Sequence, residues 1–180
     1  MVWKKRWLAA LFLLVLGMLV AGLVYLETRP RALGGLTFLW DSEELANNAV
    51  MHSGPWVPLQ LRSESLGSLP IQQAQIHVWI STSSDAELEI EVDPPPSQME
   101  TEPGTTRTWI AWEYTEMVQG SCLVHNLTLS TPRAHESSFF SDTDVEVKLQ
   151  AEMKGDNLEN LVQNLYLQIP VRGISDHSDK

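Results

Sequence analysis

The feature that most constrains this chain is an apolar segment that begins at Leu8 and ends at Leu26. Its nineteen residues include no charged residue, no side-chain amide and no proline. A helix of that length rises about 28 Å, close to the roughly 30 Å hydrocarbon core of a bilayer. The segment has no polar face at helical period, which argues against a helix buried in a soluble core. We therefore predict a transmembrane helix over residues 8–26.

A cleaved signal peptide is the alternative, because Lys4, Lys5 and Arg6 form a basic region ahead of the apolar segment. The segment, however, exceeds the usual apolar length of about 7–15 residues, and no clear small-x-small cleavage site follows it. The basic residues favour a cytoplasmic N-terminus and an extracytoplasmic C-terminal part. Aromatic residues flank the segment where interfacial rings fix the depth of a membrane helix: Trp3, Trp7 and Tyr25.

The charge of the C-terminal part is strongly acidic. The residues after Arg31 hold 7 basic and 22 acidic side chains, a net charge of −15. Such a domain lacks the positive charge that binds phosphate backbones and anionic headgroups, so we expect no nucleic-acid partner. The charge is compatible with a basic partner, or simply with solubility.

Cys122 is the lone cysteine, so no intramolecular disulfide can form. This disfavours a typical animal cell-surface domain and favours a bacterial or archaeal envelope. Asn126 begins an N-glycosylation sequon within a predicted strand, and its modification is left open.

Alternation of apolar and polar residues predicts about eight short strands after the membrane segment. The clearest is Leu88, Ile90 and Val92, which alternate with glutamates. Other strands follow from the apolar positions Leu36, Phe38 and Trp40; Val57, Leu59 and Leu61; Ala74, Ile76, Val78 and Ile80; Leu123, His125, Leu127 and Leu129; Val145, Val147, Leu149, Ala151 and Met153; and Leu165, Leu167, Ile169 and Val171. Residues 108–115 are apolar on both faces, as in a central strand.

Four local signals qualify this pattern. A short helix is predicted after Asp41 or Ser42 and up to residue 51, because acids follow a capping residue. A further turn of helix is predicted from Asp156. Pro58 indicates an edge position or the start of a strand, and residues 93–104 a long loop.

The resulting prediction is a mainly β protein. It has a transmembrane helix, one or two short helices, and an antiparallel two-sheet β-sandwich of immunoglobulin-like or jelly-roll type, with a partly open barrel as the alternative. The parts are a cytoplasmic tip (1–7), the membrane helix (8–26), a linker (27–35), the extracytoplasmic domain (36–173) and a flexible tail (174–180).

The residues that could carry chemistry form no catalytic or metal-binding pattern. His125 shares its strand face with leucines, which predicts a hydrogen-bonded core histidine. Cys122 and His125 are three residues apart on a strand and so point to opposite faces, which argues against a Cys–His pair. A polar loop carries His135, Asp142 and Asp144 but lacks the glycine and terminal glutamate of a calcium loop. We expect no cofactor, no metal and no enzyme activity.

The aromatic residues offer the one candidate surface. Trp79 falls on the polar face of its strand, and exposed tryptophan is enriched at protein interfaces. A candidate partner surface therefore comprises Trp56, Trp79, Trp112 and Tyr114. The alternative is that these are core rings, or that the helix predicted up to residue 51 covers that face.

The function that this layout favours is a single-pass, membrane-anchored protein. Its acidic β-sandwich would act as a protein-binding, accessory or assembly module of a membrane complex. The expected partners are the bilayer and another membrane or envelope protein, with oligomeric state left open. A carrier or chaperone that binds a lipid or apolar ligand between the sheets is the alternative, and an enzyme is third.

Overall fold

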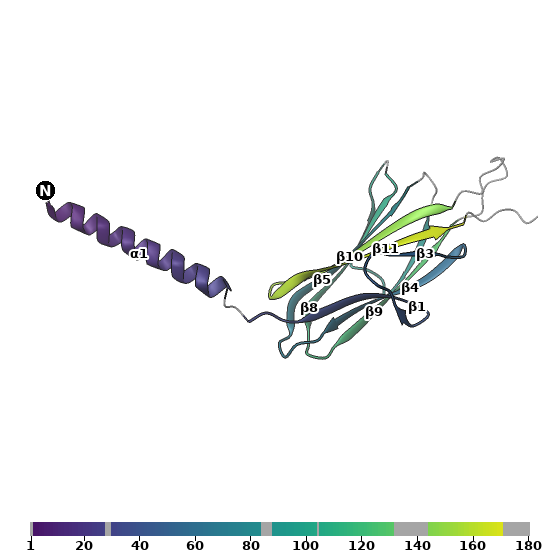
Figure 1. The fold of residues 1–180 in the computed structure, drawn as a ribbon, viewed down its shortest axis with the longest axis horizontal. Coiled ribbons are helices and arrows are strands. Elements are labelled where there is room, and N and C mark those ends of the chain that lie inside the picture. The colour runs from purple at the N-terminus through teal and green to yellow at the C-terminus, as the bar shows by residue number, and fades with distance from the viewer. Residues whose placement is uncertain (1, 28–29, 84–87, 104, 132–143, 171–180) are drawn as a thin grey trace, which may run out of the picture. The chain divides into compact units, whose positions relative to one another are not determined.

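The structure is a computed structural model of the 180-residue chain. It describes residues 2–27, 30–83, 88–103, 105–131 and 144–170. The chain divides into two compact units, Met1–Arg31 and Ala32–Lys180. The first contains the helix α1 (Val2–Glu27), and the second consists of β-strands (Figure 1).

The helix α1 is uninterrupted over 26 residues. Within the described residues, no helix is both long enough and apolar enough to cross a membrane. The predicted transmembrane span is thus not supported by the structure. The anchor residues of that prediction have side chains outside the described set: Trp3, Trp7, Leu8, Tyr25 and Leu26.

Two sheets pack face to face in the second unit, which confirms the predicted β-sandwich. The five-stranded sheet has the order β2 (Glu43–Glu44), β1 (Gly34–Trp40), β4 (Trp56–Ser65), β9 (Cys122–Ser130) and β6 (Glu89–Asp93). The six-stranded sheet has the order β3 (Ala49–His52), β11 (Leu158–Ile169), β10 (Val145–Gly155), β5 (Ile71–Thr82), β8 (Arg107–Met117) and β7 (Gln98–Thr101). β3 runs parallel to β11, so the prediction of purely antiparallel sheets was wrong at this edge.

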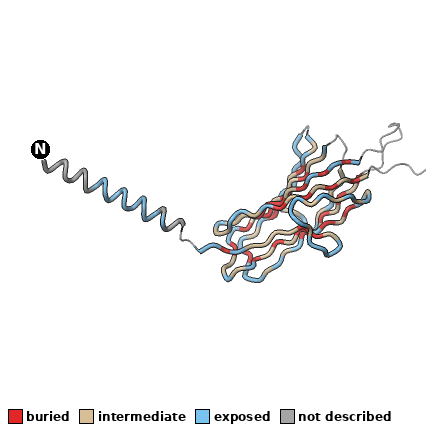
Figure 2. Tube along the Cα trace, viewed as in Figure 1, coloured by how far each residue is buried: buried red, intermediate tan, exposed pale blue. Residues whose placement is uncertain are grey.

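The core lies between the sheets, where every second residue of the longer strands is buried (Figure 2). The five-stranded sheet contributes Phe38, Leu59 and Leu61, which are at most 1% exposed. The six-stranded sheet contributes residues such as Ile76 and Leu149, both fully buried. The alternation predicted for β4, β5, β9 and β10 is therefore confirmed, because each of these strands has one face in the core.

The helix predicted after Asp41 is replaced by a hairpin and a strand. Asp41 and Ser42 have φ angles of 48° and 70°, the left-handed conformation of a two-residue hairpin turn. This turn pairs Trp40 with Glu43, and it joins β1 to β2. Because β3 follows at residue 49, the predicted helix was wrong, and the described part of the sandwich unit contains no helix.

The helical turn predicted from Asp156 is also a hairpin. Asp156 and Asn157 connect β10 to β11, with Gly155 paired to Leu158. The Asn157 side chain donates to the Pro70 carbonyl (2.8 Å) and accepts from the Gln72 amide (3.0 Å). The Ala32 amide donates to the Asn157 carbonyl (2.7 Å), so the chain enters the sandwich beside this turn. We call this the entry end of the sandwich.

Two further expectations are met only in part. β4 lies inside its sheet and not at an edge, but Pro58 is close to the start of the strand at Trp56, where β9 alone pairs with it. The loop expected over residues 93–104 contains the edge strand β7, which pairs with β8. Val171 and the tail 174–180 lie outside the described residues.

Candidate functional site

The four aromatic residues predicted to form one partner surface are dispersed. Trp112 is 2% exposed and belongs to the core, and Tyr114 is half-buried between the sheets. Trp56 is 54% exposed at the start of β4, whereas Trp79 is half-buried on the outer face of β5. The sandwich separates these last two, since they belong to different sheets. Trp79 alone keeps the predicted setting on the outer face of the six-stranded sheet.

An inter-sheet cluster holds Trp112, Tyr114 and His125. The Tyr114 hydroxyl lies 2.9 Å from His125 Nε2, and the ring centres of Trp112 and His125 are 4.3 Å apart. Trp112 Nε1 donates to the Pro94 carbonyl at 3.0 Å. The cluster joins β8 of one sheet to β9 of the other, which confirms His125 as a hydrogen-bonded core histidine.

Burial decides the protonation of this cluster. His125 is fully buried, and desolvation lowers its pKa to about 4, although the nearby Leu61 backbone opposes this shift. Its Nδ1 makes no well-aligned hydrogen bond with a described residue. Burial also raises the pKa of Tyr114. Both side chains are therefore neutral at pH 7, and they serve the core rather than proton transfer with solvent.

The outer face of the six-stranded sheet carries an aromatic patch made of His77, Trp79 and Trp109. Trp79 and Trp109 are cross-strand partners of β5 and β8. The His77 ring meets both edge to face, at centre distances of 5.5 Å and 5.6 Å. Burial lowers the pKa of His77, so the imidazole is neutral at pH 7 and packs as a third ring.

Two clefts lie on this side of the sheet, and the first adjoins the patch through Trp79. The first, of about 220 Å³, is lined by Trp79, Ser81, Arg107, Lys148 and Gln150. The second, of about 370 Å³, is lined by Val50, Ser81, Thr82, Ser83, Glu146, Val147, Lys148, Tyr166, Leu167 and Gln168. Ser81 and Lys148 line both clefts, so we treat the two as one feature and call it the outer groove.

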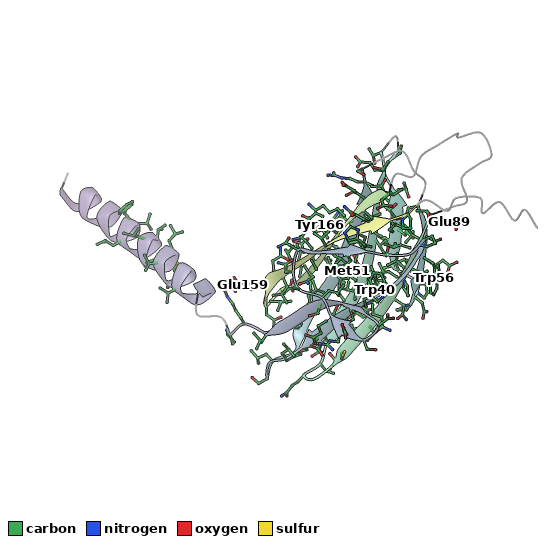
Figure 3. All side chains as sticks on the ribbon, turned by 45° about the vertical axis from the view of Figure 1, so that its right-hand side comes forward. Trp40, Met51, Trp56, Glu89, Glu159 and Tyr166 are labelled. Carbon is green, nitrogen blue, oxygen red and sulfur yellow. The ribbon has the colours of Figure 1, made fainter. Side chains whose placement is uncertain are left out.

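The register of the sheet explains the floor of the outer groove. Arg107 pairs with Ser81, Ser81 with Lys148, Lys148 with Tyr166, and Tyr166 with Val50. These five side chains form one row across β8, β5, β10, β11 and β3. With roughly 4.8 Å between strands, the row is about 19 Å long. Tyr166 and Trp56 come from different sheets, and the groove lies on the Tyr166 side (Figure 3).

The outer groove gathers unpaired positive charge. The described part of the sandwich carries the basic residues Arg62, Arg107, Lys148 and Lys154. Arg62 pairs with Glu44 and Glu64, and Lys154 with Glu152 at 2.7 Å.

Arg107 and Lys148, by contrast, form no ion pair with a described residue, and both line the groove. The Lys148 ammonium lies 5.8 Å from the centre of the Tyr166 ring. The groove therefore combines two cations with aromatic walls. The alternation of apolar and polar residues in its strand predicts that Lys148 faces outward. Its position near Arg107 and Tyr166 follows only from the order of the strands in the sheet.

The other candidates form no reactive centre among the described residues. Cys122 is exposed, and partial desolvation of its thiol together with the nearby Glu64 raises its pKa, whereas His125 is buried. No described group of three His, Cys, Asp or Glu side chains could hold a metal. His135 and Asp142 of the predicted polar loop lie outside the described residues. The expected lack of enzyme activity stays a prediction.

Comparison with known proteins finds similarity in structure alone. No known protein family matches the chain, and no curated protein matches its sequence. The chain is similar to the CooA pilin subunit of enterotoxigenic Escherichia coli (6% identity, TM-score 0.40, covering 76% of this chain and 98% of that one). It is also similar to the collagen-binding subdomain of the Enterococcus faecalis surface protein ACE (9%, 0.38, 78% and 97%) and to the sixth cohesin of Acetivibrio cellulolyticus scaffoldin B (9%, 0.40, 77% and 99%). At these scores the likeness is limited to the β-sandwich architecture.

Proposed function

We propose that the sandwich is a protein-binding module of a membrane complex, and that it binds through the outer face of its six-stranded sheet. The observation that carries this proposal is the aromatic patch beside the outer groove. Tryptophan, tyrosine and arginine are enriched where protein interfaces are buried, and Trp79, Trp109, Tyr166 and Arg107 share this one face. The described part of the sandwich unit contains no helix of its own that could cover this face.

The packing of the core disfavours the carrier alternative. The inner faces of both sheets meet through fully buried side chains such as Phe38, Leu59 and Ile76. An apolar ligand between the sheets would have to displace them at the cost of close packing. The clefts described above lie outside this core. A partner at the outer face needs no such rearrangement.

Membrane attachment through α1 is part of the proposal. The sequence from Leu8 to Leu26 carries no charge, and the described apolar side chains of α1 from Leu11 to Val20 are 46–69% exposed. A helix that is apolar all round is unfavourable in water. Lys4, Lys5 and Arg6 would then keep the N-terminus in the cytoplasm, with the sandwich outside a bacterial or archaeal membrane.

We expect the full chain to stay in the membrane pellet after alkaline carbonate extraction. A variant lacking residues 2–27 should move to the supernatant, because Ala32 and β1 of the sandwich remain. Protease added to intact spheroplasts should then digest the sandwich and spare the N-terminus. Release of the full chain by carbonate would contradict the proposed anchor.

The binding face is tested by Trp79→Ala in the full-length protein, purified in mild detergent from its own membrane. We expect the affinity for the co-purified partner to fall by about 30-fold or more, because a central interface tryptophan contributes about 2 kcal/mol or more. Trp56→Ala is the matched control, since Trp56 is exposed on the other sheet. Recovery of the wild-type protein without any stoichiometric partner would overturn the proposed function. Equal losses from the two variants would overturn the proposed face.

A further inference from the structure

We infer that the outer groove binds an extended, acidic segment of the partner protein, held by Arg107 and Lys148 and flanked by Trp79 and Tyr166. This inference rests on the proposed protein-binding function and specifies the chemistry of the partner. Its basis is the juxtaposition of two unpaired cations and two aromatic side chains along one groove.

The charge distribution selects an anionic ligand. In a domain with far more acidic than basic residues, Arg62 and Lys154 are neutralised by neighbouring carboxylates. Arg107 and Lys148 are not paired with any described carboxylate, and they stand in the same row with only Ser81 between them. Acidic side chains elsewhere on the domain act weakly here, because charges more than about 8 Å away are largely screened at physiological ionic strength. Glu146 also lines the groove, in the cleft on the Tyr166 side, whereas the cleft that contains both Arg107 and Lys148 has no acidic lining residue. A carboxylate that enters the cleft with both cations therefore meets positive charge.

The shape of the row selects an extended peptide. Its length of about 19 Å matches some six residues of extended chain. Arg107 and Lys148 are two strand spacings apart, or about 10 Å, which lies between the spans of about 7 Å and 13 Å for carboxylates two and four residues apart on one face of such a chain. Beyond Lys148 the row continues with Tyr166 and with Val50, which is 64% exposed. An apolar residue beside the acidic ones would cover these two, whereas a sugar acid with hydroxyls all round would not.

The outer groove lies far along the sandwich from its entry end. The chain enters the sandwich beside Asn157, at the entry end. Lys148 lies seven residues along β10 from Gly155 at that end, or about 23 Å. The outer groove therefore lies toward the end of the sandwich opposite the entry end.

The test uses the full-length protein in mild detergent and the fluorescence anisotropy of dye-labelled peptides of about eight residues. The first peptide contains glutamate, leucine and threonine, and a matched peptide has glutamine in place of every glutamate. We expect the glutamate peptide to bind about tenfold more tightly than the glutamine peptide, and the preference to shrink at high salt. The double variant Arg107→Gln/Lys148→Gln should lose this preference. Arg62→Gln, which removes a positive charge from the other sheet, should keep it.

Four outcomes of these binding measurements would overturn the inference. They are no binding of the glutamate peptide at millimolar concentration, equal binding of the two peptides, equal losses from the double variant and Arg62→Gln, and tighter binding of an oligogalacturonate than of any peptide. The last would assign the groove to acidic polysaccharide. A double variant that still retains the natural partner lost by Trp79→Ala would overturn this inference and leave the proposed function standing.

Discussion

Lowering the pH from 7 to 4 is expected to cost the sandwich about 3 kcal/mol of unfolding free energy through His125 alone. Above pH 6.5 the imidazole is neutral in both the folded and the unfolded chain, so its contribution to stability is fully present. As the pH falls below 6.5, the unfolded chain takes up a proton, whereas burial keeps the folded His125 neutral until about pH 4. Stability is therefore lost between these two values and levels off below the lower one.

The measurement is urea unfolding of the full chain at a series of pH values, with His125→Gln as the comparison. The variant cannot titrate at this position, so its stability should fall by about 3 kcal/mol less over the same window. Its stability at pH 7 is a separate quantity, because it also reports the altered contacts with Tyr114 and Trp112. His77→Gln controls for the other histidine whose pKa is lowered. Parallel pH profiles for wild type and His125→Gln would contradict the prediction.

Glu152 acts in a different part of the pH range. It is 8% exposed and pairs with Lys154 and with Asn160, and these partners outweigh burial and hold its pKa below the usual value. A carboxyl with a lowered pKa stabilises the fold above its unfolded pKa, and this contribution is lost as the pH falls through the folded one. The stability that Glu152 contributes is therefore lost at lower pH than the stability that His125 contributes. The two groups can be distinguished in a plot of unfolding free energy against pH.

The strands of the sandwich could be predicted because burial on one face imposes a period of two. Val57, Leu59 and Leu61 face the core while their neighbours face outward, and no helix can place three alternating residues on one side. The same reasoning placed His125 correctly, since it shares its strand face with buried leucines. Where one face of a strand is buried, the alternation of apolar and polar residues therefore predicts both the strand and the residues that face the core.

The two hairpins could not be separated from helices by the same means. Leu161 and Leu165 are four residues apart, which places them on one face of a helix but also on one face of a strand. Asp156 and Asp41 are as suitable for a tight turn as for a helix cap. The deciding contacts, such as Asn157 with Pro70 and Gln72, come from residues more than 80 positions away in sequence. The sequence around each turn does not reveal these long-range contacts.

The outer groove was beyond prediction for a related reason. Its row joins Val50, Ser81, Arg107, Lys148 and Tyr166 from five strands, and each of these residues is an ordinary outward position in its own strand. Only the order of the strands in the sheet brings these residues together, and the alternation of apolar and polar residues within a strand does not reveal that order. Trp79 could be singled out because a large ring on a polar face is unusual within a single strand.

Trp112→Ala is expected to destabilise the sandwich by about 3–5 kcal/mol, the typical cost of removing a fully buried large aromatic side chain. The Trp112 ring is 2% exposed, contacts His125 and donates to the Pro94 carbonyl, so its removal leaves a cavity between the sheets and a lost hydrogen bond. Trp112→Phe keeps most of the apolar volume and should cost clearly less. Both values follow from urea unfolding of the full chain at pH 7.

The control that gives this result its meaning is Trp56→Ala, which should change stability by no more than about 0.5 kcal/mol because Trp56 is largely exposed. Trp79→Ala should affect partner binding more than Trp112→Phe does, since Trp79 belongs to the outer face and Trp112 to the core. If Trp112→Ala unfolded at the same urea concentration as wild type, the ring could not fill the space between the sheets. The separation of the aromatic residues into core and binding face would then fail, and the proposed interface would fail with it.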